Sequence, residues 1–171
     1  MNSGEILRYL QMVGEELHKE GTRGDIVLAG GAVMLLVVRS RKMTKDVDAY
    51  LGERSEIVRA AAKRVALREG LSEDWLNDGV KGFFYGTPPQ TTVANFPGLR
   101  VYSVTPEYMV AMKAVAGRPE DIADLRHLVR FLQLTSAEQV LNIVEQYVPP
   151  RLLTTKIQYI AASLFDEEKS D

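Results

Sequence analysis

The hydrophobic positions in the first fifty residues follow helical spacing first and strand spacing afterwards. From Ser3 to Lys19, apolar side chains recur every three or four positions, which predicts an amphipathic helix with its first residue as N-cap. Two short apolar runs, Asp25–Ala29 and Asp46–Leu51, predict strands. Between them the sequence predicts a short helix, Ala32–Val38, and a polar connection, Arg39–Lys45.

The middle of the chain combines one clear helix with shorter elements. Ser55–Arg68 has a helical apolar face, and Ser72–Asp78, which holds the only tryptophan, is expected to form a short helical turn. Val80–Gly98 is interrupted by glycines and prolines, so we expect loops around a short strand at Thr92–Phe96. Leu99–Val104 predicts a third clear strand.

After this strand the apolar spacing is helical throughout. Four helices are expected, and the third opens with the capping-box pair Thr135 and Glu138. They are Pro106–Ala116, Pro119–Leu132, Thr135–Tyr147 and Arg151–Phe165. The polar tail, Asp166–Asp171, is expected to be frayed. This order predicts an α+β fold: a small mixed sheet with helices over residues 1–104, then a helical half over 105–171 packed on it as one structural unit.

Composition places the chain among ordinary globular proteins. It has 171 residues, of which 46% are hydrophobic and 26% are charged. No apolar run approaches the roughly 18 residues needed to span a bilayer, and the N-terminus lacks the pattern of a signal peptide. We therefore expect a cytoplasmic protein without a membrane partner.

Charge and metal-binding residue types narrow the chemistry further. The net charge of -2 gives no general argument for nucleic-acid binding, although Arg39, Arg41, Lys42 and Lys45 form either a local basic patch or a solvated loop. The chain has no cysteine and two histidines, which excludes thiolate chemistry and disfavours zinc. A metal would be held by carboxylates, which favours Mg²⁺ or Mn²⁺.

Two short motifs in the first third are candidates for that chemistry. Asp46 and Asp48, two positions apart in a predicted strand, would share one face of the sheet, where a cation would relieve their repulsion. The alternative is an edge strand whose acids face water. Gly30 and Gly31 lie between a strand and a helix and would let backbone approach a phosphate closely, or would form a plain tight turn.

Taken together, strand, Gly-Gly, short helix and an Asp-x-Asp strand resemble the nucleotidyltransferase superfamily. The approach to the acids, Arg41-x-x-Thr44-x-Asp46-x-Asp48, is similar to that of the toxins of AbiEii-type, or type IV, toxin–antitoxin systems.

A later segment, Lys113-x-x-x-x-Arg118-x-x-Asp121-x-x-Asp124-Leu125, is similar to the lysine–arginine–aspartate segment of the same group. The alternatives are a solvated Lys113 and an Arg118 that pairs with Asp121 or with the neighbouring glutamate.

The resemblance implies a role for each matching residue. Asp46 and Asp48 would hold the metal. The nucleotide would contact Gly30, Gly31, Thr44, Lys113 and Arg118. The catalytic set would be Asp46, Asp48, Asp121 and Lys113, in which Asp121 either completes the metal site or serves as general base.

The same resemblance implies a Mg²⁺-dependent enzyme. It would move a nucleotidyl group from a nucleoside triphosphate to an RNA or protein acceptor, as a toxin with a cognate antitoxin. One departure stands out, because many superfamily members carry a third metal-side carboxylate on a later strand, whereas Leu99–Val104 has no acid. The alternatives are therefore a catalytically incomplete binding module and a nucleotidyltransferase acting on a small hydroxylated molecule.

Overall fold

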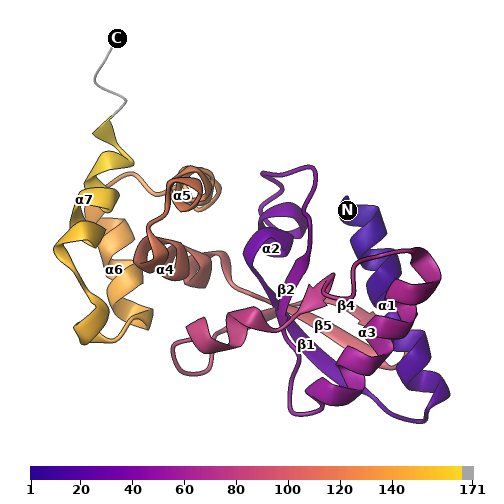
Figure 1. Cartoon of the computed structure of the whole chain (residues 1–171). Coiled ribbons are helices and arrows are strands. Elements are labelled where there is room, and N and C mark those ends of the chain that lie inside the picture. The colour runs from indigo at the N-terminus through magenta and orange to yellow at the C-terminus, as the bar shows by residue number, and fades with distance from the viewer. Residues whose placement is uncertain (167–171) are drawn as a thin grey trace. The chain divides into compact units, whose positions relative to one another are not determined.

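The computed structural model describes residues 1–166 and divides the chain into two compact units (Figure 1). The first unit consists of Met1–Gly82 and Gln90–Val104. The second consists of Phe83–Pro89 and the chain from Thr105 onward. The tail that we expected to be frayed lies, beyond Asp166, outside the described residues.

The strands of the described chain form one mixed sheet, which belongs to the first unit. Its order is β3-β2-β1-β5-β4. The central strand, β1, runs antiparallel to β2 and parallel to β5, while β3 is parallel to β2 and β4 is antiparallel to β5. The strands are β1 (Gly24–Ala29), β2 (Val47–Tyr50), β3 (Leu76–Asn77), β4 (Gln90–Phe96) and β5 (Leu99–Val104). The predicted α+β class with a mixed sheet is thereby confirmed.

Helices α1 (Ser3–Lys19), α2 (Gly30–Leu36) and α3 (Ser55–Glu69) complete the first unit. The N-cap of α1 is Asn2 rather than the predicted Ser3. The Asn2 side chain accepts from the backbone N–H of Glu5, and the Glu5 carboxylate accepts in return from the backbone of Asn2. This reciprocal pair fixes the start of α1 one residue earlier than the apolar spacing alone indicates.

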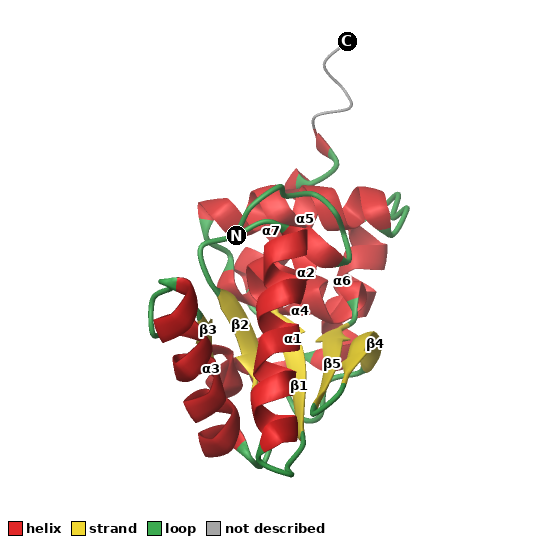
Figure 2. Ribbon diagram, turned by 90° about the vertical axis from the view of Figure 1, so that its right-hand side faces the viewer, coloured by secondary structure: helices red, strands yellow, loops and turns green. Residues whose placement is uncertain are grey.

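One face of the sheet is a buried core covered by α1 and α3. Figure 2 shows α1 lying across the strands, and α1 packs against both α3 and β5. Strand residues on this face have no exposed surface: Ile26, Leu28, Val47, Ala49 and Val101. Val47 and Ala49, on either side of Asp48, therefore face the core. Alternate positions place half-buried side chains on the other face, namely Asp48, Tyr50, Arg100 and Tyr102.

The second unit contains the helices α4 (Pro106–Ala116), α5 (Pro119–Phe131), α6 (Ala137–Tyr147) and α7 (Thr155–Ser163). Gly117, at φ +58°, ends α4 in the left-handed region, and Pro119 opens α5 at a position that needs no backbone donor.

Two predicted starts in this unit are wrong. The capping box of α6 is Ser136 with Gln139, one residue later than predicted. Pro150–Leu152 forms a separate 3₁₀ turn, so α7 begins only at Thr155.

The prediction of a helical turn at Ser72–Asp78 is wrong in its second half. The Trp75 indole N–H donates to the Ala62 carbonyl at 3.0 Å, and the Trp75 carbonyl accepts from the Val47 N–H at 2.7 Å. These bonds hold Trp75 in the core, and the following residues join the sheet as β3. A 3₁₀ helix, Gly79–Phe83, follows β3. Within residues 1–166, no helix is long and apolar enough to cross a bilayer.

Candidate functional site

The glycine turn at the end of β1 is built so closely that a side chain would not fit. Gly30 has φ +59°, in the left-handed region that favours glycine. A Cβ placed on Gly30 would lie 2.7 Å from Oδ2 of Asp48, which is shorter than real Cβ contacts. The β1–β2 register, in which Ala29 is opposite Asp48, brings the carboxylate to this position. Backbone and carboxylate therefore meet at one point on the strand-to-helix turn.

Asp46 does not share the strand of Asp48, contrary to the prediction. The strand β2 begins at Val47, and Asp46 lies in the bend before it. The Asp46 carbonyl accepts a hydrogen bond from the Thr44 hydroxyl at 3.1 Å, a local bond that turns the chain just before the strand. Both aspartates are half-buried. A shared face for the two carboxylates therefore does not follow from strand alternation, since only Asp48 belongs to β2.

The loop between α2 and β2 lies over Gly31. A Cβ on Gly31 would be 2.8 Å from the Thr44 hydroxyl oxygen and 3.4 Å from a terminal nitrogen of Arg41. The loop is held by a reciprocal backbone pair with Met1, whose nitrogen donates to the Thr44 carbonyl at 2.7 Å and whose carbonyl accepts from the Thr44 N–H at 2.9 Å. Sequence reasoning placed Arg41 in the motif without giving it a role. The structure adds its guanidinium to the glycine turn.

The strand of Asp48 lies between β1 and β3, and it does not pair with β5, the strand in which a third acid was sought. Asp48 pairs with Asn77 in the parallel β2–β3 register, whereas β5 lies on the far side of β1. The Asn77 amide oxygen accepts from the Gly79 N–H at 3.2 Å, so this side chain also closes the following turn. On the β3 side, therefore, the residue in register with Asp48 carries an amide and not a carboxylate.

The donor set at the glycine turn suits a hard cation with few protein ligands. Among residues 1–166, no group of three or more histidine, aspartate or glutamate side chains is arranged to hold a metal. Mg²⁺ usually keeps several waters and takes one or two carboxylates together with substrate phosphates. The carboxylate of Asp48, set against bare glycine backbone where a Cβ would collide, matches that requirement.

The second unit brings together the four residues of the later motif. Lys113 of α4 places its ammonium 2.9 Å from a carboxylate oxygen of Asp121 and 2.9 Å from one of Asp124, both on α5. Asp121 has no exposed side-chain surface and Asp124 almost none, and Lys113 is 12% exposed. The alternative of a solvated Lys113 is therefore excluded. The ion pair of Arg118 with Asp121 is confirmed at 2.8 Å.

Asp121 accepts hydrogen bonds from four donors. Three come from Arg118, namely its backbone N–H at 3.1 Å, its Nε at 2.8 Å and its Nη2 at 3.2 Å, and the fourth is the ammonium of Lys113. Four bonds match the lone-pair sites of a carboxylate. Burial by itself would raise the pKa of Asp121, but these bonds and the positive charge of Lys113 hold that pKa below its ordinary value. Asp121 is therefore an ionised partner that orients two cations.

Comparison with known proteins identifies the family. The model of a family described as "Nucleotidyltransferase of unknown function (DUF6036)" matches residues 7–149, which include both motifs. The match covers most of the chain, so the protein belongs to this nucleotidyltransferase family. No curated protein and no solved structure matched the chain.

Proposed function

We propose, from its membership of a nucleotidyltransferase family, that this protein binds a nucleoside triphosphate with Mg²⁺ or Mn²⁺ and moves the nucleotidyl group to a hydroxyl of an RNA or protein acceptor. The observation that supports this most directly is the meeting of the Asp48 carboxylate with the Gly30 backbone. Phosphoryl-group chemistry depends on positioning and charge neutralisation, and this turn supplies a carboxylate and open backbone side by side.

Each candidate site residue of the first unit has a proposed role in this reaction. Gly30, Gly31 and Thr44 hold the phosphates, and Asp46 and Asp48 hold the metal. A divalent cation bound there would neutralise charge on the phosphates. In the transfer, the acceptor oxygen forms a bond to the α-phosphorus and the bond to the pyrophosphate oxygen breaks. Pyrophosphate leaves, and the hydroxyl proton passes to water.

In the second unit we propose that the cations bind phosphate and that a carboxylate positions them. Lys113 and Arg118 contribute positive charge for the nucleotide phosphates. Asp121 positions them, since its four hydrogen bonds leave no lone pair for a metal or for the proton of an acceptor. This proposal replaces the general-base role that the family resemblance suggested for Asp121.

The decisive experiment is transfer of label from α-labelled triphosphates to total RNA and to total protein in the presence of Mg²⁺. We expect label with the wild type and none with Asp48→Asn, which keeps the side-chain shape but removes its charge. Asp74→Asn, at an exposed aspartate of the same unit, is the matched control and should retain activity. The label also identifies the acceptor class. Absence of transfer with all four common triphosphates would refute the enzymatic proposal.

A toxin role is a finer proposal, supported by the motif resemblance alone. Induced expression of the wild type should slow growth of the host, and Asp48→Asn should relieve the effect. A cognate antitoxin would be identified as a neighbouring gene product that restores growth when it is co-expressed with the wild type. Growth that is unchanged by the wild type at high expression would refute the toxin role and leave the transferase proposal in place.

The second candidate function is a nucleotide-binding module without turnover. The specific observation in its favour is Asn77, a neutral side chain in register with Asp48 on the neighbouring strand. This candidate predicts Mg²⁺-dependent nucleotide binding by calorimetry that is lost in Asp48→Asn, with no transfer of label by the wild type.

A further inference from the structure

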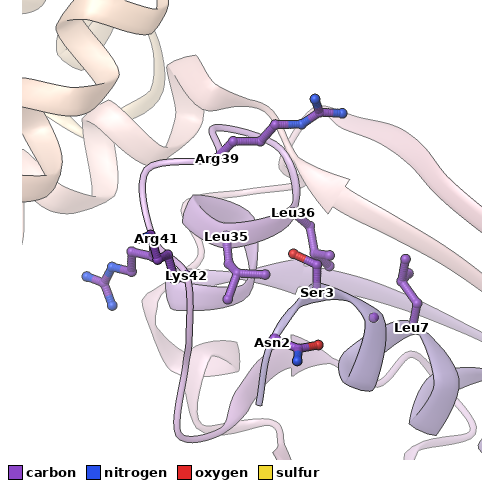
Figure 3. Close-up of a pocket in the computed structure, with 9 residues that line it drawn as sticks. Asn2, Ser3, Leu7, Leu35, Leu36, Arg39, Arg41 and Lys42 are labelled. Carbon is purple, nitrogen blue, oxygen red and sulfur yellow. The ribbon is translucent and has the colours of Figure 1, made fainter.

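An open hollow of about 570 Å³ lies in the first unit, between the first turn of α1, the end of α2 and the loop that follows. Three leucines, Leu7, Leu35 and Leu36, line it together with three cations, Arg39, Arg41 and Lys42. Figure 3 shows Leu36 of α2 beside Ser3 and Leu7 of α1, with Arg39 and Arg41 projecting from the loop in different directions. The hollow thus combines an aliphatic lining with positive charge at its margin.

Two of the three cations of the hollow, Arg39 and Lys42, have no carboxylate partner within residues 1–166. Both of these side chains are exposed. None of the lining residues is acidic. Elsewhere in the same unit the arrangement differs, since Arg64 and Arg68 both bind Glu16, at 3.1 and 2.6 Å. Because the chain as a whole carries a net charge of -2, this local excess is the feature that would attract a polyanion.

Arg41 connects the hollow with the glycine turn. It lines the hollow, and its terminal nitrogen lies 3.4 Å from the position of a Cβ on Gly31. The two features therefore share a residue. A polymer lying in the hollow would therefore contact Arg41, which lies beside the turn where we propose that the triphosphate binds.

We infer that this hollow, defined by Leu7, Leu35, Leu36, Arg39, Arg41 and Lys42, binds the phosphodiester backbone of an RNA acceptor. The inference rests on the proposed function for its role in transfer and names the acceptor class. RNA supplies a phosphate for the cations at every nucleotide, and the faces of its base rings are apolar surface that packs against the leucines. Lys42 and Arg39 bind phosphate oxygens of the strand, and Arg41 lies between the strand and the nucleotide.

The test is direct binding of a short fluorescein-labelled single-stranded RNA, measured by anisotropy without nucleotide at several salt concentrations. The double variant Arg39→Glu/Lys42→Glu should bind this RNA at least about tenfold more weakly. The negative slope of log affinity against log salt should become less steep by about 1.4, which is the expected loss for two phosphate contacts on a single strand. Mg²⁺-dependent nucleotide binding should not change. The control Lys19→Glu/Lys63→Glu alters two exposed lysines of the same unit by the same charge and should bind RNA like the wild type.

A neutral double variant, Arg39→Gln/Lys42→Gln, tests the same site without introducing negative charge and should lose affinity to a smaller extent. RNA binding unchanged in both double variants, or lost equally in the control, would overturn the inference. Tighter binding of polyglutamate than of RNA would also overturn it, in favour of an acidic protein partner. RNA binding that depends on the hollow, with no label transfer by the wild type, supports the inference while the transferase proposal fails. Transfer of label to RNA that is unaffected in the double variants would support the transferase proposal and overturn the inference about the hollow.

Discussion

Asp48 and Gly30 are fitted to each other so closely that neither leaves room for a larger neighbour. Oδ2 of Asp48 occupies a position 2.7 Å from where a Gly30 Cβ would be, and Gly30 has a φ of +59°. The close approach and the positive φ each require glycine at this position. The relationship joins the two short motifs of the first third of the chain into one structural feature.

Gly30→Ala should therefore abolish nucleotide binding while the protein still folds. The positive φ costs about 1 kcal/mol for alanine, and the new Cβ displaces the Asp48 carboxylate. Gly70→Ala is the matched control, because Gly70 also has a positive φ, +68°, but nothing lies within 4 Å of its added Cβ. Thermal denaturation should show destabilisation in both variants, larger in Gly30→Ala because its Cβ also meets Asp48, and nucleotide calorimetry should show loss of binding in Gly30→Ala alone. Equal nucleotide affinity in the two variants would contradict the prediction.

The loop between α2 and β2 lies over Gly31, so substitutions at Gly31 and Thr44 should have coupled effects on stability. In Gly31→Ala the added Cβ would be 2.8 Å from the Thr44 hydroxyl oxygen, so we expect lower stability. Thr44→Ala removes that oxygen and should restore part of the stability when combined with Gly31→Ala. A double-mutant cycle by chemical denaturation should give a coupling of about 1 kcal/mol, which is typical of residues in contact. Strictly additive effects would show that the loop moves away freely.

Lys113 should be required for folding of the second unit in addition to any role in binding. Lys113→Met leaves the buried carboxylates of Asp121 and Asp124 without their shared cation, and breaking one partner of a buried pair costs about 3–5 kcal/mol. Lys156→Met, at an exposed lysine of the same unit, should change stability by less than about 0.5 kcal/mol. Denaturant unfolding of both variants compares them directly. A small effect of Lys113→Met would indicate that water replaces the ammonium.

The ionised carboxylate of Asp121 should make the free energy of unfolding decrease at acidic pH. Its pKa in the folded protein lies below the ordinary value of 3.8, so its ionised form stabilises the fold above about pH 4, and this contribution is lost as pH falls through the folded-state pKa. Asp121→Asn should be less stable than the wild type at neutral pH, and the difference should shrink on acidification below about pH 4. Denaturation curves over a pH series measure this convergence. A difference that stays constant with pH would mean that the carboxylate charge is not involved.

Most helices of this protein were predictable because their signals are local. The apolar spacing of α1 and the Gly117 to Pro119 boundary between α4 and α5 depend on residues within one or two turns. Sheet order depends instead on pairing between distant segments. The sequence gives no local sign that β5 pairs with β1, or that the residues after Trp75 form β3 beside β2.

The candidate site also has one part that the sequence predicts and another part that only the tertiary structure reveals. The glycine turn and the strand of Asp48 follow from spacing, because one short helix and one loop separate them. Asp46 lies in a bend where its carbonyl accepts from the Thr44 hydroxyl, and the approach of Arg41 to Gly31 depends on how the intervening loop folds. Such details require the tertiary structure, since each arises from one contact rather than from a repeating pattern.

A substitution at Asn77 tests whether a second carboxylate beside Asp48 strengthens metal binding. Asn77→Asp places a charge in register with Asp48 and keeps an oxygen for the Gly79 N–H, so the local turn should persist. Repulsion between the two acids should lower stability without metal, and Mg²⁺ or Mn²⁺ should reverse the loss, so the metal-induced rise in Tm should exceed that of the wild type. Asn95→Asp, on the outer strand β4, adds the same charge and should show no gain in metal response. A metal response equal in the two variants would show that the position beside Asp48 does not face the metal.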